Sequence, residues 1–380
     1  MQELITRAKE LLADGTVSRV LGWKKGDMGW DPEPAYFEKE EDLKDFVYNP
    51  FCGANLSKYL IAAGKLEGTT LVFLKPCDTY SFNQLTKEHR VKREKTYIIG
   101  VGCHGTLKAE KVLSAGIKGI EDALQAAYPD WSVRRAFTAQ IIINHVQARD
   151  GEKIDNMQQA MDRAVENGVK NLVVQPTHLM HGAEYDEMME MIDEYKDQFE
   201  SVAVAEPLLG EVGADATEIN ADKEAVATAI TTEAVAAAGY DDAAAAAADG
   251  TAFVFMGHGT SHTAKISYSQ MQMTMQTLGY DNVFIGTVEG EPEDTACEAV
   301  IEKIKEAGYT KVVLRPLMVV AGDHANNDMA GDDEDSWLSQ FKAADCFDSV
   351  DTQIAGLGEI GDIQQLYIDH AQAAIDSLNG

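Results

Sequence analysis

Short apolar runs alternate with helical patterns along most of this chain. Helices are expected between the runs, for example over 157–168 and 294–308. Strand–helix alternation predicts an α/β fold with parallel sheets flanked by helices, in which loops at the carboxyl ends of the strands carry ligands. The expected strands cover 69–76, 96–102, 133–138, 171–176, 201–207, 252–257, 282–288 and 311–320, with a weaker candidate at 350–356.

The character of the chain changes twice, and these changes suggest its domains. Residues 1–95 hold aromatic and proline-containing segments with one clear strand, and form a small N-terminal α/β module of unassigned role. Residues 212–250 are alanine-rich and acidic, so they form either a solvated helix joining two lobes or a poorly ordered linker. We therefore expect one lobe over 96–211, a second similar lobe over 251–380, and a cleft between them.

Composition and charge exclude several classes of partner. The 380 residues include 63 acidic and 32 basic side chains, giving a formal net charge of −31. Nucleic acids and anionic membranes bind basic faces, so neither is an expected partner. No apolar run approaches the roughly 18–20 residues of a membrane span, and the first residues lack the apolar core of a signal peptide. The expected location is the cytoplasm.

The five cysteines are widely spaced, and no C-x-x-C motif occurs. An odd number of scattered cysteines disfavours both a disulfide framework and a local zinc knuckle. This pattern agrees with a reducing compartment.

Three successive strands of the second lobe end in residues that suit metal chemistry. His258 follows an apolar strand in FVFMGHGTSH, between Gly257 and Gly259, which allow a sharp turn and the close approach of a flat ligand. Glu289 follows the strand of NVFIGTVEGEP, and His324 follows the strand of LRPLMVVAGDHANNDMAGDDEDSW. Because neighbouring parallel strands place their tips at one edge, we expect these side chains to meet. Together they would suit cobalt, nickel, iron or zinc and leave coordination sites open.

Each of these residues also has a plain structural explanation. A histidine at a strand end can simply bond a backbone carbonyl, and a loop glutamate can simply be solvated. Glu291 is better explained as a solvated loop glutamate than Glu289 is. The acidic run 332–335 is explained as a solvated or helix-starting segment, because acids suit a helix N-terminus, although it could also attract cations.

The segment of roughly 97–380 resembles the sirohydrochlorin cobaltochelatases of the anaerobic cobalamin pathway. The matching stretches are RAFTAQIIINH (135–145), VVQPTHLMHGAEYDEM (173–188), VFMGHGTSH, GTVEGEP, PLMVVAGDHANNDMAGDDEDSW and GLGE (356–359). The resemblance implies that His258, Glu289 and His324 bind the metal. It also implies insertion of Co²⁺ into the macrocycle with release of two protons, with His258 as proton acceptor and Glu289 as a relay. No organic cofactor is expected, and Fe²⁺ or Ni²⁺ remain open as alternatives to Co²⁺.

The implied substrate carries many carboxylates, so cations must face it in this acidic protein. Arg135 is the main candidate, and His178 is implied as a residue lining the cleft. The weaker candidates are Arg134, Lys265, Arg315 and His181, and His89, His145 and His370 look structural or superficial. The expected partners are thus a sirohydrochlorin-type tetrapyrrole and a divalent metal, and self-association into a homo-oligomer stays open.

The chain departs from this family near its start. Such chelatases open with a strand and Ser-Phe-Gly-Thr-Ser, whereas this chain has VGCHGT at 101–106, which leaves part of the substrate contact open. The first 120 residues or so resemble the amino-terminal part of iron–sulfur proteins related to deazaflavin-dependent hydrogenase and dehydrogenase beta subunits. Cys52, Cys77 and Cys103 match cysteines there but form no standard cluster motif. An iron–sulfur or flavin redox protein, and a carrier without turnover, are therefore the alternative functions.

Overall fold

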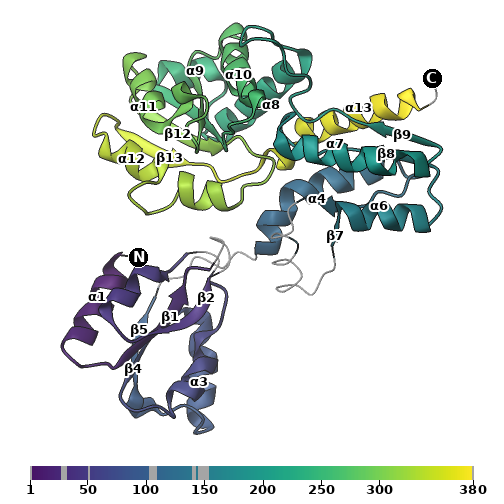
Figure 1. Ribbon diagram of the computed structural model, residues 1–380. Helices are drawn as coiled ribbons and strands as arrows, with labels where there is room; N and C mark the ends of the chain where they lie inside the picture. Colours follow the sequence, from purple (N-terminus) through teal and green to yellow (C-terminus); the bar gives the residue numbers. More distant parts are fainter. Residues whose placement is uncertain are drawn as a thin grey trace. The chain divides into compact units, whose positions relative to one another are not determined.

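The computed structural model describes residues 2–26, 32–49, 52–101, 109–138, 143 and 154–378 (Figure 1). The chain forms two compact units, Met1–Val112 and Leu113–Gly380. Most of the VGCHGT loop, with Cys103, lies outside the described residues, as do His145 and the side chain of Cys77.

The first unit is built on a five-stranded mixed sheet. Its strands are β1 (Arg19–Lys24), β2 (Glu33–Phe37), β3 (Phe46–Val47), β4 (Thr70–Leu74) and β5 (Thr96–Gly100). Their order is β2-β1-β4-β5, and β3 pairs beside β1. Helices α1 (Gln2–Ala13), α2 (Leu60–Ala63) and α3 (Pro76–Lys87) complete the unit. Trp23 and Phe73 are fully buried in its core, so the unit has a hydrophobic interior of its own.

Strand β5 belongs to the run 96–102, which is shared by the amino-terminal and the chelatase resemblances and was expected to open the first chelatase lobe. In the structure it pairs in parallel with β4, from Thr70↔Thr96 to Leu74↔Gly100. The chelatase boundary expected at residue 95 stays a prediction, while the compact units of the structure divide near residue 112. The reason is physical: an apolar run such as TYIIG predicts a buried strand but does not specify which sheet it joins.

The second unit contains a four-stranded parallel sheet in its carboxyl-terminal lobe. Its strands are β10 (Thr251–Gly257), β11 (Val283–Thr287), β12 (Lys311–Pro316) and β13 (Ser349–Thr352), in the order β11-β10-β12-β13. Helices α10 (Ile266–Thr277), α11 (Cys297–Glu306) and α12 (Trp337–Ala343) connect them. Every residue of β10 is buried, because this strand lies in the middle of the sheet.

The amino-terminal lobe of this unit has two short parallel pairs of strands. β6 (Ala136–Phe137) pairs with β7 (Asp155–Asn156), and β8 (Asn171–Val174) pairs with β9 (Ser201–Val204). The helices of this lobe are α4 (Ala109–Ala127), α6 (Met157–Glu166) and α7 (Ala183–Tyr195). The last helix of the chain, α13 (Gly361–Ser377), packs against β8 and β9, so the chain returns to this lobe at its end (Figure 1).

The alanine-rich segment is part of the core, which corrects the expectation of a solvated helix or disordered linker. It forms α8 (Ala221–Ala237) and α9 (Ala243–Ala248). Val226, Ala227 and Ile230 of α8 are completely buried, in the same core cluster as Phe253 and Phe255 of β10. Alanine composition favours helix in either setting, and its small side chain also allows close packing. Composition alone therefore could not distinguish a buried helix from an exposed one.

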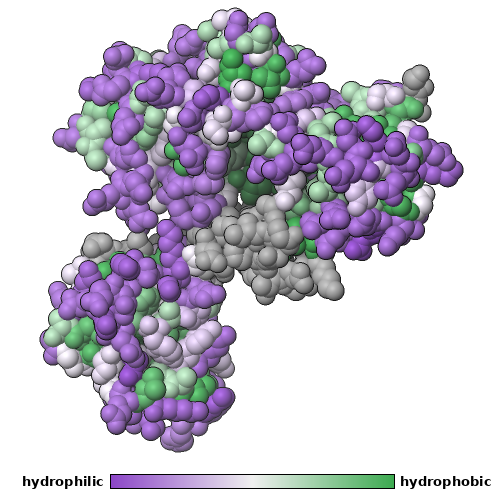
Figure 2. All heavy atoms as spheres, viewed as in Figure 1, coloured by the Kyte–Doolittle hydropathy of each residue, from purple (hydrophilic) through white to green (hydrophobic). Residues whose placement is uncertain are grey.

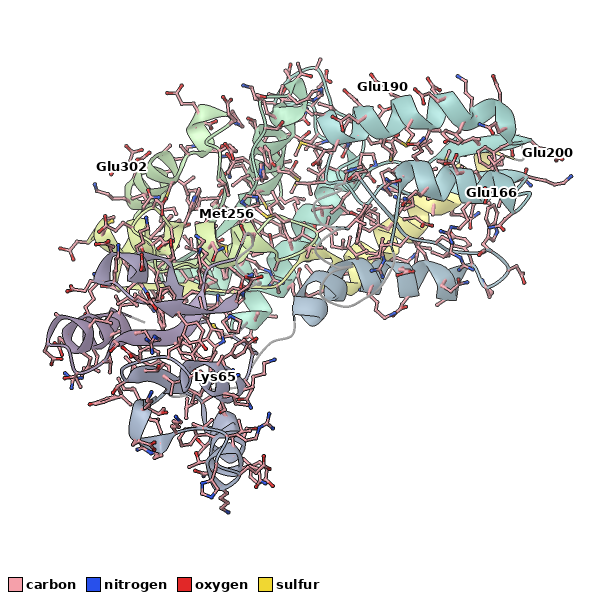
Figure 3. All side chains as sticks on the ribbon, turned by 60° about the horizontal axis from the view of Figure 1, so that its bottom comes forward. Lys65, Glu166, Glu190, Glu200, Met256 and Glu302 are labelled. Atoms are coloured by element: carbon pink, nitrogen blue, oxygen red, sulfur yellow. The ribbon has the colours of Figure 1, made fainter. Side chains whose placement is uncertain are left out.

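Figure 2 shows hydrophilic residues over most of the visible face of each unit. Glu190 on α7 and Glu302 on α11 are exposed, whereas Met256 on β10 is fully buried (Figure 3). None of the described helices is both long and apolar enough to cross a membrane.

Candidate metal and substrate site

His258 stands at the carboxyl tip of β10, directly after the last buried residue of that strand. Its Nδ1 lies 2.8 Å from the carbonyl oxygen of Gly259. A carbonyl can only accept a hydrogen bond, so Nδ1 carries the proton. In the neutral ring, Nε2 therefore keeps its lone pair and can bind a metal or accept a proton. The imidazole is exposed.

His324 follows β12 and immediately precedes a π-helical turn, Ala325–Met329. Its Nδ1 lies 2.5 Å from Oδ2 of Asp328, and the same reasoning leaves Nε2 with the lone pair. The rings of His258 and His324 are 4.5 Å apart between centroids, at an interplanar angle of 82°. Two imidazoles from different strand tips thus lie side by side, each with its Nδ1 already bonded.

Glu289 approaches His258 through its backbone. Its amide N–H donates to the carbonyl oxygen of His258, with N and O 2.9 Å apart. Its carboxylate is exposed and makes no hydrogen bond or ion pair with the described residues. Within the described part of the chain, no three His, Cys, Asp or Glu side chains are arranged to hold a metal ion. The structure brings the two histidine rings together and the backbone of Glu289 beside them, and joint coordination of a metal by the three side chains stays a prediction.

The two glycines beside His258 have steric reasons within the protein. Gly259 has φ +92°, where L side chains are rare, and a Cβ there would lie 2.8 Å from Cβ of Glu289. A Cβ on Gly257 would lie 2.4 Å from the ring of Tyr268. The Tyr268 hydroxyl in turn accepts a hydrogen bond from the Gly259 amide, at 3.1 Å. Packing explains both glycines, and their contact with a flat ligand stays a prediction.

The sequence family described as "Cobalt chelatase (CbiK)" matches residues 96–376. This chain belongs to the cobalt chelatase family. A sirohydrochlorin cobaltochelatase of Salmonella typhimurium is 32% identical over 260 residues, covering 68% of this chain and 89% of that protein. The sirohydrochlorin cobaltochelatase CbiKC of Nitratidesulfovibrio vulgaris is 27% identical over 297 residues, covering 77% of this chain and 95% of that protein. These findings confirm the predicted family and the expectation of a metal chelatase.

The amino-terminal resemblance also has support. The F420-dependent formate dehydrogenase 1 subunit beta of Methanococcus maripaludis is 30% identical over 99 residues, which is 26% of each chain. The match covers a quarter of that protein, so it identifies a related segment and not its activity. Cys52 in this unit is completely buried, and burial raises the pKa of its thiol to about 12. An inert packed thiol agrees with the structure better than a cluster ligand does.

Three of the cations proposed to face the substrate already have protein partners in this chelatase. Nε of Arg135 lies 3.1 Å from the carboxylate of Glu121 on α4, and a second guanidinium nitrogen is closer still. Nζ of Lys265 lies 2.7 Å from Glu291. Arg315 is buried, and burial lowers the pKa of its guanidinium. Nη1 of Arg315 donates to the side-chain oxygen of Gln353, 2.9 Å away, so all three cations have structural partners within the protein.

Arg134 differs from these three cations. Its side chain is exposed and donates only to the neighbouring carbonyl of Val133, at 2.8 Å. It is therefore more available to an anionic substrate than the sequence had suggested.

His178 lies just beyond β8 in the first lobe of the chelatase. Its Nδ1 is buried without a hydrogen-bond partner, and burial lowers the pKa of the imidazole. Its ring meets Tyr185 edge-on, with centroids 6.3 Å apart. The side chain is therefore a neutral imidazole at physiological pH, and its role as a substrate contact stays a prediction.

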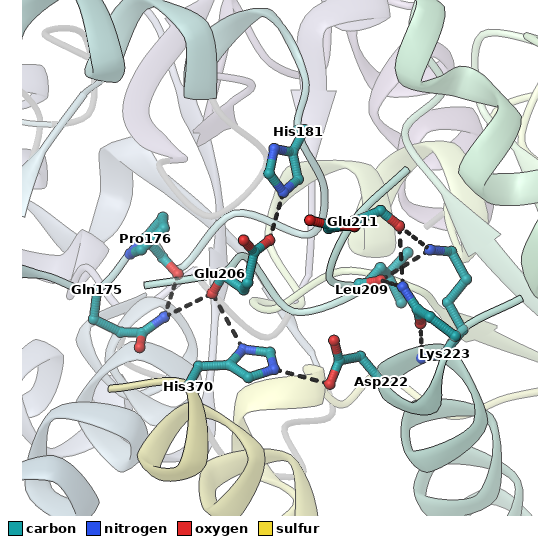
Figure 4. Close-up of polar contacts among 10 residues, drawn as sticks. Gln175, Pro176, His181, Glu206, Leu209, Glu211, Asp222, Lys223 and His370 are labelled. Atoms are coloured by element: carbon teal, nitrogen blue, oxygen red, sulfur yellow. Dashed lines mark hydrogen bonds and ion pairs between the residues drawn. The ribbon is translucent and has the colours of Figure 1, made fainter. Parts of the chain in front are cut away.

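His181 and His370 belong to a polar network that the sequence did not reveal (Figure 4). Nε2 of His181 lies 2.7 Å from the carboxylate of Glu206, whose carbonyl oxygen is 3.1 Å from Nδ1 of His370. Nε2 of His370 lies 3.0 Å from Asp222 on α8. The network connects the end of β9 with α13 and α8, so His370 is a structural histidine, as expected.

Sequence reasoning also missed residues close to the predicted metal ligands. Asp328 contacts His324, and Nε2 of His262 lies 3.2 Å from Asp186 on α7 of the other lobe. The signal for Asp328 was present, because residues four apart on a helical turn share a face. The His262–Asp186 pair joins residues far apart in sequence, and nothing local in the sequence indicates it.

Proposed function

We propose that this chain inserts Co²⁺ into sirohydrochlorin, with release of two protons, in the anaerobic route to cobalamin. The observation that carries the proposal is the adjacency of His258 and His324, whose Nε2 lone pairs are both unused, next to Glu289. Family membership and the named relatives support cobalt as the metal and sirohydrochlorin as the macrocycle.

The residue types fit the chemistry of insertion. Imidazole nitrogen and carboxylate oxygen suit a borderline divalent ion, and three protein ligands leave positions at which ring nitrogens can replace water. The macrocycle loses two N–H protons as it gains the dication, so the charge balances. Once the metal has passed from the protein to the ring nitrogens, Nε2 of His258 would be free to accept one of these protons. The exposed carboxylate of Glu289, which has no partner among the described residues, would accept the other, and both protons would then pass to solvent.

The anionic substrate needs cations near the site. Arg134 is exposed, and Arg135 could exchange the carboxylate of Glu121 for one of the substrate. His178, as a neutral imidazole, would contact the macrocycle or a side-chain carboxylate of the substrate by hydrogen bonding. Gly257 and Gly259 would leave room for the flat ring beside His258.

The metal and the location are the parts of the proposal that go beyond the family. Fe²⁺ and Ni²⁺ suit the same ligands, because ligand type alone does not select among these metals. Cys52, Cys297 and Cys346 are free thiols, which supports a reducing compartment such as the cytoplasm.

One observation favours a second candidate, a metal or tetrapyrrole carrier without turnover. Among the described residues of the first lobe, the strands form two separate pairs, and β5 pairs within the other unit. A lobe with a divided sheet could bind the macrocycle without holding it in the distorted shape that insertion needs.

The test is an anaerobic absorbance assay of sirohydrochlorin with Co²⁺. The wild-type chain is expected to form the metallated ring well above the protein-free rate, and His258→Ala to lose that acceleration by 10²-fold or more, on the order expected for loss of a general base. His89→Asn is the matched control, because His89 is an exposed histidine in the first unit. A wild-type rate in His258→Ala would refute the assigned site. Binding without acceleration by the wild type would favour the carrier.

A further inference from the structure

Asp328 contacts one of the candidate metal ligands, His324, through its carboxylate. Its Oδ2 lies 2.5 Å from Nδ1 of His324, the ring nitrogen that points away from a metal held on Nε2. The family resemblance assigned no role to this residue, and the sequence pattern did not single it out. Its only described side-chain partner is His324.

The local backbone brings these two residues together. The five residues that follow His324, Ala325–Met329, form a π-helical turn. Ala325 and Met329 are completely buried and fix this turn to the core, while His324 and Asp328 project from its accessible side. Single π-helical turns are rare and occur mainly at functional sites. The buried Ala325 and Met329 therefore fix the turn, and the turn holds the Asp328 carboxylate against the His324 imidazole.

We propose that Asp328 is a positioning residue for cobalt insertion: it fixes the His324 ring and directs Nε2 toward the metal. The inference rests on the proposed function of His324 as a metal ligand. A carboxylate bonded to the far nitrogen of a metal-binding imidazole fixes its tautomer and orientation and makes it a better ligand. The corresponding acceptor at His258 is weaker, because Nδ1 of His258 donates to the neutral carbonyl of Gly259 and not to a carboxylate. The two imidazoles are thus unequal: His324 is supported for holding the metal, and His258 is left freer to take a proton.

Exposure separates this role from a purely structural one. The side chains of His324 and Asp328 are 39% and 42% exposed. Hydrogen-bonded ion pairs at this level of exposure contribute little to folding stability. Removing the carboxylate should therefore weaken metal binding while leaving the protein folded.

The experiment measures Co²⁺ binding and chelation in the full chain for Asp328→Ala, Asp328→Asn and Asp328→Glu. Binding of Co²⁺ alone is followed by its visible absorption bands, and chelation by the change in the macrocycle spectrum. Asp332→Asn is the matched control, because it removes an equal charge four residues further along, on an exposed side chain. His324→Ala is included to test the ligand itself.

We expect Asp328→Ala to weaken Co²⁺ binding by about 10–100-fold, the usual effect of losing such a partner. The KM for sirohydrochlorin and the melting temperature should stay near wild type. Asp328→Asn, which can still accept a hydrogen bond, should lose less, Asp328→Glu should restore part of the loss, and Asp332→Asn should bind Co²⁺ as the wild type does. If Asp328→Ala does not fold, the asparagine variant provides the same comparison.

Two results distinguish the positioning role of Asp328 from the proposed role of His324 as a metal ligand. Wild-type Co²⁺ affinity in Asp328→Ala and Asp328→Asn, together with lost affinity in His324→Ala, would overturn the positioning role and leave the ligand intact. Unchanged affinity in His324→Ala would instead overturn the proposed metal site. An equal loss in Asp332→Asn would show that general charge, and not the contact with His324, attracts the cation.

Discussion

The two lobes of the second unit differ in how their strands are joined. In the carboxyl-terminal lobe, the first strand, β10, lies between β11 and β12 and holds four parallel strands together. In the described part of the amino-terminal lobe, β6–β7 and β8–β9 are separate pairs. The run that resembles β10 in sequence, TYIIGVGCHGT against TAFVFMGHGT, provides β5 of the other unit.

Among the described residues, this difference explains the place of the candidate metal site in the carboxyl-terminal lobe. A continuous sheet brings the carboxyl tips of adjacent strands to one edge, and there His258 lies beside His324 and the backbone of Glu289. In the other lobe, Arg135 and His178 come from different strand pairs and are held by local contacts. Adjacency of strands, more than the identity of the residues, determines where the ligands can meet.

The largest effect is expected when the first unit, which contains β5, is unfolded alone. Val72 of β4 is completely buried beside β5, and Val72→Asp should destabilise that unit by roughly 4–5 kcal/mol, because it buries a charge without a partner. Thermal melting should then show an early transition separate from that of the second unit. Co²⁺ binding should persist, since His258 and His324 lie in the other unit.

Chelation by Val72→Asp also shows whether the second unit needs the unit that contains β5. Retained chelation would show that the second unit works without the first. Lost chelation with intact Co²⁺ binding would show that the first lobe depends on the unit that holds β5. Lost Co²⁺ binding would contradict the independence of the two units.

A smaller effect is expected from adding a methyl group at the turn after β10. Gly259→Ala should cost roughly 1–3 kcal/mol, because φ is +92° and the new Cβ would lie 2.8 Å from Cβ of Glu289. Chelation should fall strongly, since Glu289 is displaced. Gly182→Ala in the other lobe is the control: its φ is −95°, and a Cβ there would meet only Met180, at 4.0 Å. Equal losses in the two variants would refute the steric explanation.

Lys223, on the helix that follows the first lobe, predicts a pH effect of about 1 kcal/mol. Its ammonium is fully buried and donates to the carbonyls of Leu209 and Glu211, and burial lowers its pKa to about 8. Between about pH 8 and the unfolded pKa near 10.4, the unfolded chain binds more protons, so this residue makes the free energy of unfolding rise with pH. Denaturant unfolding at pH 7.5 and pH 9 should show this rise in the wild type relative to Lys223→Met. A parallel pH dependence in both proteins would contradict it.

Sequence alone predicted the local parts of this structure well and its long-range contacts poorly. The runs at 252–257, 282–288 and 311–320 coincide closely with β10, β11 and β12, because apolar strands bounded by turns are a local signal. The positions of His258 and His324 followed from those strand ends.

The choice of sheet for β5 and the burial of α8 did not follow, because TYIIG and an alanine-rich helix suit more than one environment. The pairing of Arg135 with Glu121 depends on how α4 packs, and no local pattern specifies it.

The smallest expected effect concerns a contact between the lobes beside the metal site. Nδ1 of His262 accepts a hydrogen bond from the amide of Ala264, so its Nε2 carries a proton toward Asp186 on α7, 3.2 Å away. The Asp186 side chain is 59% exposed, so the pair should contribute about 0.2–1 kcal/mol. Asp186→Asn should therefore raise the KM for sirohydrochlorin only a few-fold and leave kcat and Co²⁺ binding unchanged.

The control is Asp193→Asn, which removes the same charge from the same helix but breaks a pair with Lys196 inside one lobe. It should leave KM unchanged. A wild-type KM in both variants would mean that the contact between the lobes does not affect substrate binding, whereas a loss of kcat in Asp186→Asn would mean that it also maintains the geometry at His258.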